Sequence, residues 1–524
     1  MKKNKFLSGV IILSVFGFIS KSLGAVYRIP LTYILSSEGM GLYQMVFPLY
    51  ALLLSISSSG FPASISKLIS EHNAKGEYQQ ARNIFYKSLI LLLCFSGFCS
   101  VIIFAFGKNI AGLQGNSEAG ILYMAISPAI IIVALSSGFK GYFQAYENMV
   151  PSSIYMVIEQ LGKLVFGILL AKLFIKYGIT YAVLGSILGI VLSELVALIY
   201  LLLHFIVHKR RNVIVLSGEC FSLKKTNIQI LTVVIPITFG GIILPISAFI
   251  DSSIIINLLT KAGFTSKIAT SLFGLSSGVV GSIINMPVVF SLAITTAILP
   301  LTSKLVTNKN STQINNGVSL SLLFNIVVML PCTIVLYVFS DLIVDLLYGG
   351  CLSTSFSFVA SELLKYGAFA SLYLSIVQVT TGALQGLNKV IVPVISLALG
   401  VLIKTIITIV LVRNPEINIF GIEIASCACY GISALFNLII LLKKVKFVYK
   451  SDLIKCLSAN VLFFAASMII RKVILDFASG RLAVILIMFI SFICLCVLYY
   501  MMYRETVNLY LTSKRKNKKQ LNKV

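Results

Sequence analysis

Apolar runs of roughly bilayer length recur about fourteen times along this chain, separated by short polar segments. A backbone surrounded by hydrocarbon must satisfy its own hydrogen bonds, so runs of this length form helices. Apolar residues occupy 58% of the 524 positions and charged residues 11%, so most surfaces must face lipid or another apolar helix. The sequence therefore predicts an all-α polytopic membrane protein with about 14 transmembrane helices.

Several of the expected spans exceed the ~20 residues that a straight helix needs to cross a membrane. Four prolines lie within them, at Pro30, Pro48, Pro245 and Pro287. These prolines are candidate hinges, and the alternative for each is a static kink packed against its neighbours. The expected spans are residues 6–35, 41–69, 84–107, 118–143, 152–175, 181–207, 230–258, 268–302, 316–340, 359–384, 393–412, 421–442, 456–474 and 482–503.

Basic residues concentrate in alternate loops, which sets the predicted orientation. The net charge of +25 would favour nucleic acid in a soluble protein, but here the cations lie at helix ends, where they meet anionic membrane lipids. We therefore expect no nucleic-acid site, and both termini on the cytoplasmic side. The cytoplasmic set includes Lys75, Arg82, Lys209, Arg210, Arg211, Lys224, Lys225, Lys304, Lys309, Lys443, Lys444, Lys446, Lys450 and Lys455.

The chain also repeats itself. The segments Gly141–Pro151 and Gly382–Pro393 contain Gly, Gln, Asn and Pro in the same order, and the glycines are displaced by 241 residues. The same displacement carries Lys163 onto Lys404. The alternative is chance similarity between apolar segments.

A second sequence match relates Pro62–Leu68, at the end of the second span, to Pro300–Leu305, at the end of the eighth. Two parallel six-helix units follow, which is typical of transporters. The expected division is an N-terminal lobe at residues 1–229, a C-terminal lobe at 230–442, and two further spans with a basic tail at 443–524.

Four segments carry a family resemblance: Ser20–Pro30, Leu35–Gln44, Gly60–Leu68 and Leu299–Lys304. They resemble the stage V sporulation protein B and polysaccharide biosynthesis proteins of the multidrug/oligosaccharidyl-lipid/polysaccharide exporter superfamily, which are related to lipid II flippases. The resemblance covers essentially the whole chain and includes the number of spans.

This resemblance implies an alternating-access flippase that moves a lipid-linked oligosaccharide across a bacterial cytoplasmic membrane. Lipid II is the expected substrate, for peptidoglycan or spore-cortex synthesis, with a sporulation membrane and cell-wall synthesis proteins as further expectations. The chain departs from better-characterised lipid II flippases, because Leu49-Tyr-Ala-Leu52 follows Pro48 where they carry an arginine pair. Ser282–Pro287 also lacks their basic residue, so their set of cavity arginines cannot be transferred.

A pyrophosphate-linked sugar needs a hydrated, cationic cavity. Lys21 and Arg28 lie seven residues apart, about two helical turns, and so share one helix face. Charges deep in a span are costly unless they face water or a partner, which makes this pair the expected pyrophosphate contacts. Snorkelling to the interface or pairing with a carboxylate is the alternative.

Other intramembrane charges provide further candidates. Lys163 and Lys404 are expected to flank the cavity as substrate-binding residues, against the alternative of anchoring helix ends. Asp251 is a candidate ion site or charge partner. Glu159, Glu194 and Glu423 are expected to pair with lysines, with proton uptake as the less favoured role.

No catalytic pattern competes with transport. The three histidines are scattered, no Walker sequence is present, and we expect no metal and no cofactor. Energy would come from an ion gradient, the membrane potential or substrate flow. The alternatives are a multidrug or cation antiporter, an exporter of another lipid-linked polysaccharide, a glycosyltransferase using Asp341 and Asp345, and a scaffold without transport activity.

Overall fold

The computed structural model describes residues 2–211, 223–307 and 311–477, together with helical positions 487, 490, 491 and 493–499. Within these ranges every regular element is a helix, which confirms the predicted all-α fold. The helices are α1 (Lys2–Ser58), α2 (Phe61–Ala74), α3 (Tyr78–Leu113), α4 (Gly120–Ala145), α5 (Val150–Gly162), α6 (Ile168–Phe174), α7 (Ile179–Arg211), α8 (Leu223–Gly241), α9 (Ile243–Lys261), α10 (Ser266–Phe273), α11 (Gly281–Thr307), α12 (Ser311–Val338), α13 (Ser340–Tyr348), α14 (Thr354–Gly386), α15 (Ile391–Val412), α16 (Phe420–Leu442) and α17 (Lys450–Phe477).

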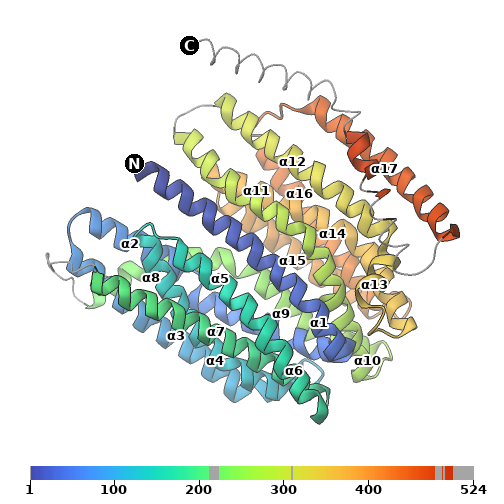
Figure 1. Cartoon of the computed structure of the whole chain (residues 1–524), viewed down its shortest axis with the longest axis horizontal. Coiled ribbons are helices and arrows are strands. Elements are labelled where there is room, and N and C mark those ends of the chain that lie inside the picture. The colour runs from blue at the N-terminus through green and yellow to red at the C-terminus, as the bar shows by residue number, and fades with distance from the viewer. Residues whose placement is uncertain are drawn as a thin grey trace.

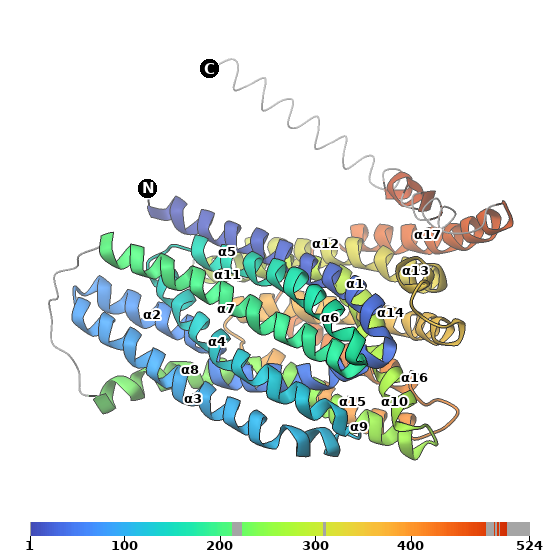
Figure 2. The same cartoon turned by 60° about the horizontal axis from the view of Figure 1, so that its bottom comes forward.

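The described residues contain 12 segments long and apolar enough to cross a membrane. The first of them, Val15–Ala74, contains two expected spans, because α1 is broken at Ser36, whose φ of 56° and ψ of −174° are not helical. The chain reverses at this break, so α2 returns to the end of the bundle at which the chain begins (Figure 1, Figure 2). The expected fourteenth span, 482–503, lies mostly outside the described residues.

Several expected spans are divided more finely than the sequence predicted, the fifth among them by the π-helical turn Lys163–Gly167 between α5 and α6. The second is interrupted by a turn at Ser59 and Gly60, where α1 ends before α2 begins. The seventh is broken at Ile242, between α8 and α9. The eighth contains a π-helical turn, Gly274–Val280, between α10 and α11. The short helix α13 was not predicted, since its nine residues cannot cross a membrane.

Helix packing follows the same pattern in both parts of the chain. Helix α4 packs on α2, α3 and α7, and α14 packs on α11, α12 and α16. Helix α1 packs on α5 as α9 packs on α15. Helix α8 begins at Leu223, so the boundary expected at residues 229/230 lies inside this helix. The assignment of two lobes by residue number stays a prediction.

The repeat extends to the backbone at the ends of α4 and α14. Glu147 has φ 57° and Asn388 has φ 61°, and the two positions are 241 residues apart. Each follows a helix end at which an amide bonds back to a carbonyl five residues earlier: Asn148 to Phe143 at 3.0 Å, and Lys389 to Leu384 at 2.8 Å. This left-handed cap satisfies carbonyls that the helix end leaves free.

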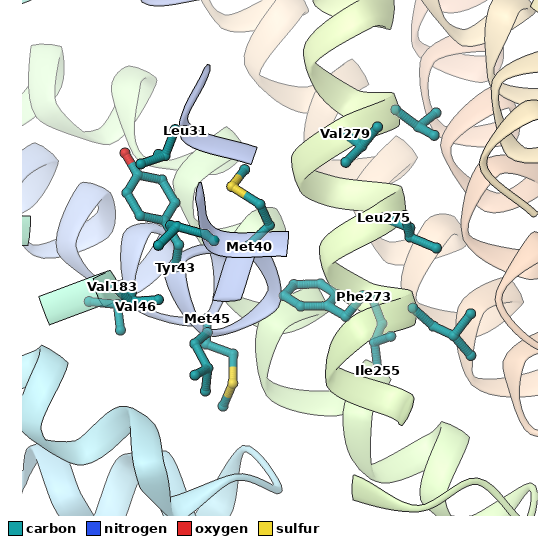
Figure 3. Packing of buried hydrophobic residues seen from close by; sticks show 14 of the residues in the cluster. Leu31, Met40, Tyr43, Met45, Val46, Val183, Ile255, Phe273, Leu275 and Val279 are labelled. Atoms are coloured by element: carbon teal, nitrogen blue, oxygen red, sulfur yellow. The ribbon is translucent and has the colours of Figure 1, made fainter. Parts of the chain in front are cut away.

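The largest apolar core joins the second part of α1 to α9, α10 and the π turn at Gly274–Val280 (Figure 3). Met40, Met45 and Phe273 are buried there. The backbones approach closely, because a Cβ at Gly274 would lie 2.2 Å from the Ser37 carbonyl oxygen. Small residues at helix contacts allow such packing where the bilayer offers no hydrophobic driving force.

Gly274→Ala is expected to destabilise the protein by about 1–3 kcal/mol, because the added methyl must displace backbone. The measurement is the midpoint of thermal unfolding of purified protein in detergent, followed by size-exclusion chromatography. Gly97→Ala is the matched control, since a Cβ at Gly97 meets nothing within 4 Å. Equal midpoints for the two variants would contradict the close packing at Gly274.

Candidate functional site

A polar cavity of about 440 Å³ lies between helices from both parts of the chain. Helix α1 and the α5 region provide one wall, and α11 and α14 provide the other. Three of the four predicted substrate-binding residues line it. The lining residues are Ser20, Lys21, Gly24, Tyr27, Arg28, Tyr43, Phe47, Gln160, Lys163, Ile190, Ser282, Asn285, Val288, Val289, Leu292 and Gln378.

One face of α1 presents Lys21, Gly24 and Arg28 to the cavity, as their helical spacing predicts. Arg28 Nη1 donates to Ser282 Oγ at 3.1 Å, so the guanidinium bridges α1 and α11. Ser20 Oγ donates to the Met156 carbonyl at 3.2 Å and holds α1 against α5. Lys21 has an exposed side chain and Arg28 a partly buried one, so both are accessible from the cavity.

Lys163 is the first residue of a second π-helical turn, Lys163–Gly167. Such turns add a residue to a helix, re-aim its side chains and are frequent at functional sites. The Lys163 ammonium pairs with Glu159, and it lies 3.0 Å from Glu194 Oε1. Glu194 Oε2 also accepts a hydrogen bond from the Tyr155 hydroxyl at 2.7 Å. The expected pairing of both glutamates with a lysine is thus present.

Lys404 lies apart from the other predicted contacts and is not a lining residue of the polar cavity in this conformation. Its ammonium is 2.5 Å from Asp251 Oδ2, and both side chains are largely buried, at 9% and 14% exposure. Asp251 therefore serves as a charge partner for Lys404. Glu423 does not join this ion pair directly, and its Oε1 accepts from Ser276 Oγ at 2.9 Å.

The four candidate hinge prolines occupy different positions. Pro30 precedes the break at Ser36 by six residues, and Pro48 lies within the helical part of α1 that follows it. Pro245 lies in the first turn of α9, where its missing N–H costs nothing. Pro287 lies in α11 and lines a neighbouring apolar cavity. Their action as hinges stays a prediction.

That apolar cavity, of about 850 Å³, was missed by the sequence reasoning. Val289 lines both cavities, so they adjoin at α11. Its residues carry no distinguishing signal, since any lipid-facing helix has the same composition. They are Phe18, Ser22, Ile283, Met286, Pro287, Val289, Phe290, Val327, Val328, Pro331, Cys332, Val335, Leu336, Ile343, Leu346, Leu347, Phe463, Leu495 and Tyr499.

A third cavity, of about 620 Å³, lies where α12, α13, α14 and α17 meet. Arg471 Nη2 donates to Asp341 Oδ2 at 2.6 Å, and Arg471 Nη1 donates to the Val338 carbonyl at 2.5 Å. Asp341 and Asp345, considered above for glycosyl transfer, both line it. Both basic residues of its described lining have an acidic neighbour. Arg471 has Asp341, and Lys365 lies 3.3 Å from Glu362.

Hydrogen bonds close the bundle at the end where α3 meets α4. The turn after α3 contacts α9 and α10, and two of the bonds are made to backbone carbonyls. Asn257 Nδ2 donates to the Leu113 carbonyl, and Ser266 Oγ to the Gly115 carbonyl, both at 2.7 Å. The side chains of Gln114 and Asn116 donate to Ser252 and Thr270, both at 3.2 Å.

Comparison with known proteins identifies the family. The model for polysaccharide biosynthesis proteins matches residues 6–306, which is more than half of the chain. The chain belongs to the polysaccharide biosynthesis protein family. The MatE family model also matches, over residues 236–410. These matches confirm the resemblance found in the sequence and place this family member in the multidrug/oligosaccharidyl-lipid/polysaccharide exporter superfamily.

Two curated relatives come from Bacillus subtilis (strain 168). Stage V sporulation protein B is 28% identical over 436 residues, which is 81% of each chain. Lipid II flippase MurJ is 24% identical over 464 residues, covering 85% of this chain and 84% of the relative. This polysaccharide biosynthesis family member thus spans most of the length of both relatives.

Solved structures share the fold. Lipid II flippase MurJ in an inward closed conformation has a TM-score of 0.73 at 16% identity, covering 95% of this chain and all of the other. An inward-facing multidrug resistance MATE family transporter has a TM-score of 0.65 at 14% identity, covering 81% of this chain and 96% of the other. The family member described here is therefore a multi-pass membrane protein with this helical fold.

Asp251→Asn is expected to lower the free energy of unfolding by about 3–5 kcal/mol, because it leaves the buried Lys404 ammonium without its carboxylate. The double variant Asp251→Asn, Lys404→Met should recover most of the loss, since neither charge then remains buried. Thermal unfolding midpoints in one detergent compare the variants.

The matched control is the exposed pair of Lys67 and Glu71, whose side chains are 59% and 49% exposed. Glu71→Gln is expected to change stability by less than about 1 kcal/mol. A double variant no more stable than Asp251→Asn alone would show that the pair does not act as a unit.

Proposed function

We propose that this protein is a flippase that carries a polyprenyl-pyrophosphate-linked oligosaccharide across the membrane by alternating access. One observation carries the proposal: a cationic polar cavity adjoins an apolar cavity at Val289. A lipid-linked sugar has the same two parts, an anionic polar head and a long hydrocarbon tail. The head would occupy the polar cavity while the tail stays in apolar surroundings.

The charges of the polar cavity support an anionic substrate. Lys21, Arg28 and Lys163 line it, and its described lining includes no Asp or Glu. A pyrophosphate accepts charge-assisted hydrogen bonds from such groups. Hydroxyl and amide groups from Ser282, Asn285 and Gln378 are suited to sugar hydroxyls. A cation antiporter, the second candidate within this fold, would need an acidic lining instead.

The hydrogen bonds between the α3 end and α9 and α10 support one direction of the cycle. With a cytoplasmic N-terminus, as the basic loops predict, this closed end is the outer one. The lipid head would enter from the cytoplasm, and relative movement of the two lobes would open the outer end. An inside-negative potential favours outward movement of an anion by about 2.3 kcal/mol per charge per 100 mV, so the potential is a proposed energy source.

Lipid II is the proposed substrate. Support comes from the relative named as a lipid II flippase, which this chain matches along most of its length. The sporulation relative supports use in spore-forming cells, with cell-wall synthesis proteins as partners and anionic lipids at the basic loops. Another lipid-linked polysaccharide is the runner-up, because Leu49-Tyr-Ala-Leu52 replaces the arginine pair of better-characterised flippases.

Removing both α1 cations should slow translocation of labelled lipid II in proteoliposomes by more than ~10-fold, since each charged hydrogen bond contributes ~1.5–3 kcal/mol. The variant is Lys21→Ala, Arg28→Ala, compared with wild type and empty vesicles. Lys75→Ala, Arg82→Ala is the control, because it removes the same charge from exposed positions outside the cavity.

Loss of transport in the cavity variant alone would support the cationic site. Equal transport by both double variants would refute the assignment of Lys21 and Arg28. If wild type moves another lipid-linked glycan but not lipid II, the substrate assignment changes and the mechanism stands.

The apolar cavity makes a separate prediction. Val328→Phe should weaken binding of a long-chain polyprenyl pyrophosphate by ~4-fold to ~15-fold, because displacing one or two methylenes from the cavity costs ~0.8 kcal/mol each. Affinity for a pyrophosphate with a two-carbon chain should not change. Binding is measured by displacement of a fluorescent prenyl pyrophosphate in detergent.

Val101→Phe is its control, since Val101 is 66% exposed on α3, away from both cavities. Equal weakening of long-chain and short-chain binding by Val328→Phe would show that the tail does not occupy this cavity.

A further inference from the structure

The ion cluster around Lys163 contains more buried carboxylate than one lysine can neutralise. Glu159 reaches it from α5 and Glu194 from α7. Glu194 is 3% exposed and Glu159 is 19% exposed. A single ammonium, which also lines the polar cavity, therefore bridges two largely buried carboxylates.

The second cation of the cluster is Lys140 on α4, whose ammonium lies 4.5 Å from the centre of the Tyr155 ring. It interacts electrostatically with both glutamates. With Lys163 in place, two cations balance two anions. The other polar and titratable groups that face the cluster are Tyr27, Tyr43 and Tyr50 on α1, Ser136 on α4, and Tyr155 and Gln160 on α5.

The repeat-related lysine has a different environment. Lys404 pairs with Asp251 alone among the described carboxylates within ion-pair distance. Gly400 lies one turn before Lys404, in the place that Glu159 takes before Lys163. A second carboxylate within ion-pair distance is therefore present at the lysine that lines the cavity and not at Lys404.

We infer that Glu159 and Glu194 take up one proton between them when a bound pyrophosphate draws the Lys163 ammonium into the cavity. This inference rests on the proposed function, and it names the proton as the ion linked to substrate binding. It assigns to the two glutamates a role in charge compensation beyond holding Lys163 in place.

The physical reason is the charge left behind. Once Lys163 turns to the anion, Glu159 and Glu194 face each other with only Lys140 to neutralise them. Two neighbouring carboxylates in a weakly hydrated site cannot both stay ionised without sufficient counter-charge. A proton taken from the buffered solution through the cavity forms an O–H bond on one carboxylate, and Lys140 balances the other.

Proton and anion then stabilise each other's binding. By linkage, the affinity for pyrophosphate falls as pH rises, because the proton that accompanies the anion becomes scarcer. Movement of the anion with one proton also transfers one negative charge less than movement of the anion alone.

The test is isothermal titration calorimetry of detergent-solubilised full-length protein in buffers of different ionisation enthalpy. The probe is undecaprenyl-pyrophosphate-linked N-acetylglucosamine, a pyrophosphate diester that is fully ionised at neutral pH. Wild type should take up about one proton per bound ligand. Glu194→Gln should bind the probe with no linked proton, because the one remaining carboxylate, Glu159, and Lys140 already balance each other's charge. The amide oxygen of the new glutamine can still accept a hydrogen bond from Tyr155.

Glu159→Gln is a second variant with the same expected loss, should Glu194→Gln fold poorly. Glu423→Gln is the matched control, since Glu423 is also a buried glutamate in a span but is hydrogen-bonded to Ser276, outside the Lys163 cluster, and it should keep the wild-type proton count. Binding by wild type without proton uptake, or uptake unchanged in both glutamine variants, overturns this inference alone. Absence of any binding of the probe overturns the proposed function, and this inference with it.

Discussion

The cost of a charge in hydrocarbon determines how the interior of this protein is arranged. Lys21, Arg28, Lys163 and Lys404 each have at least one of two surroundings: a polar cavity or a carboxylate. Lys21 and Arg28 face the polar cavity, and Lys404 is held by Asp251. Lys163 meets both conditions at once, because it lines the cavity and pairs with two glutamates. That double environment distinguishes it from Lys21, Arg28 and Lys404, and under the proposed function it is the point where substrate charge and protein charge would interact.

Much of the fold and part of the site could be predicted from sequence, because the length of an apolar run and the spacing of residues along one helix can be read directly from neighbouring positions. The seven-residue spacing of Lys21 and Arg28 placed both on the face that lines the cavity. The repeat offset that pointed to Lys404 could not reveal its partner, because Asp251 lies 153 positions away on another helix. Spacing along one helix cannot reveal which distant carboxylate packs against it. The apolar cavity was beyond prediction because its lining has the composition of any lipid-facing surface.

The repeat is visible in the backbone, but the charged side chains at related positions have different partners. The left-handed caps at Glu147 and Asn388, and the matching packing of α4 and α14, are properties of main chain and small residues. Charged side chains do not follow the same rule, since Lys163 has two carboxylates and Lys404 has one. In the proposed cycle, two similar halves would rock against each other about a shared interface while only one of them binds the anion through its lysine.

The shared wall at Val289 has a consequence for selectivity among lipid carriers. The polar cavity is bounded, with a volume of about 440 Å³ in this conformation, whereas a hydrocarbon chain could continue from the apolar cavity into the bilayer. Under the proposed function, discrimination between substrates would therefore depend on the head group, and carriers with chains of different length would enter by the same cavity. Carriers loaded with different glycans, or returned empty after their glycan is used, would compete for the same protein. Flux of any one precursor would then depend on how quickly the cell recycles the others.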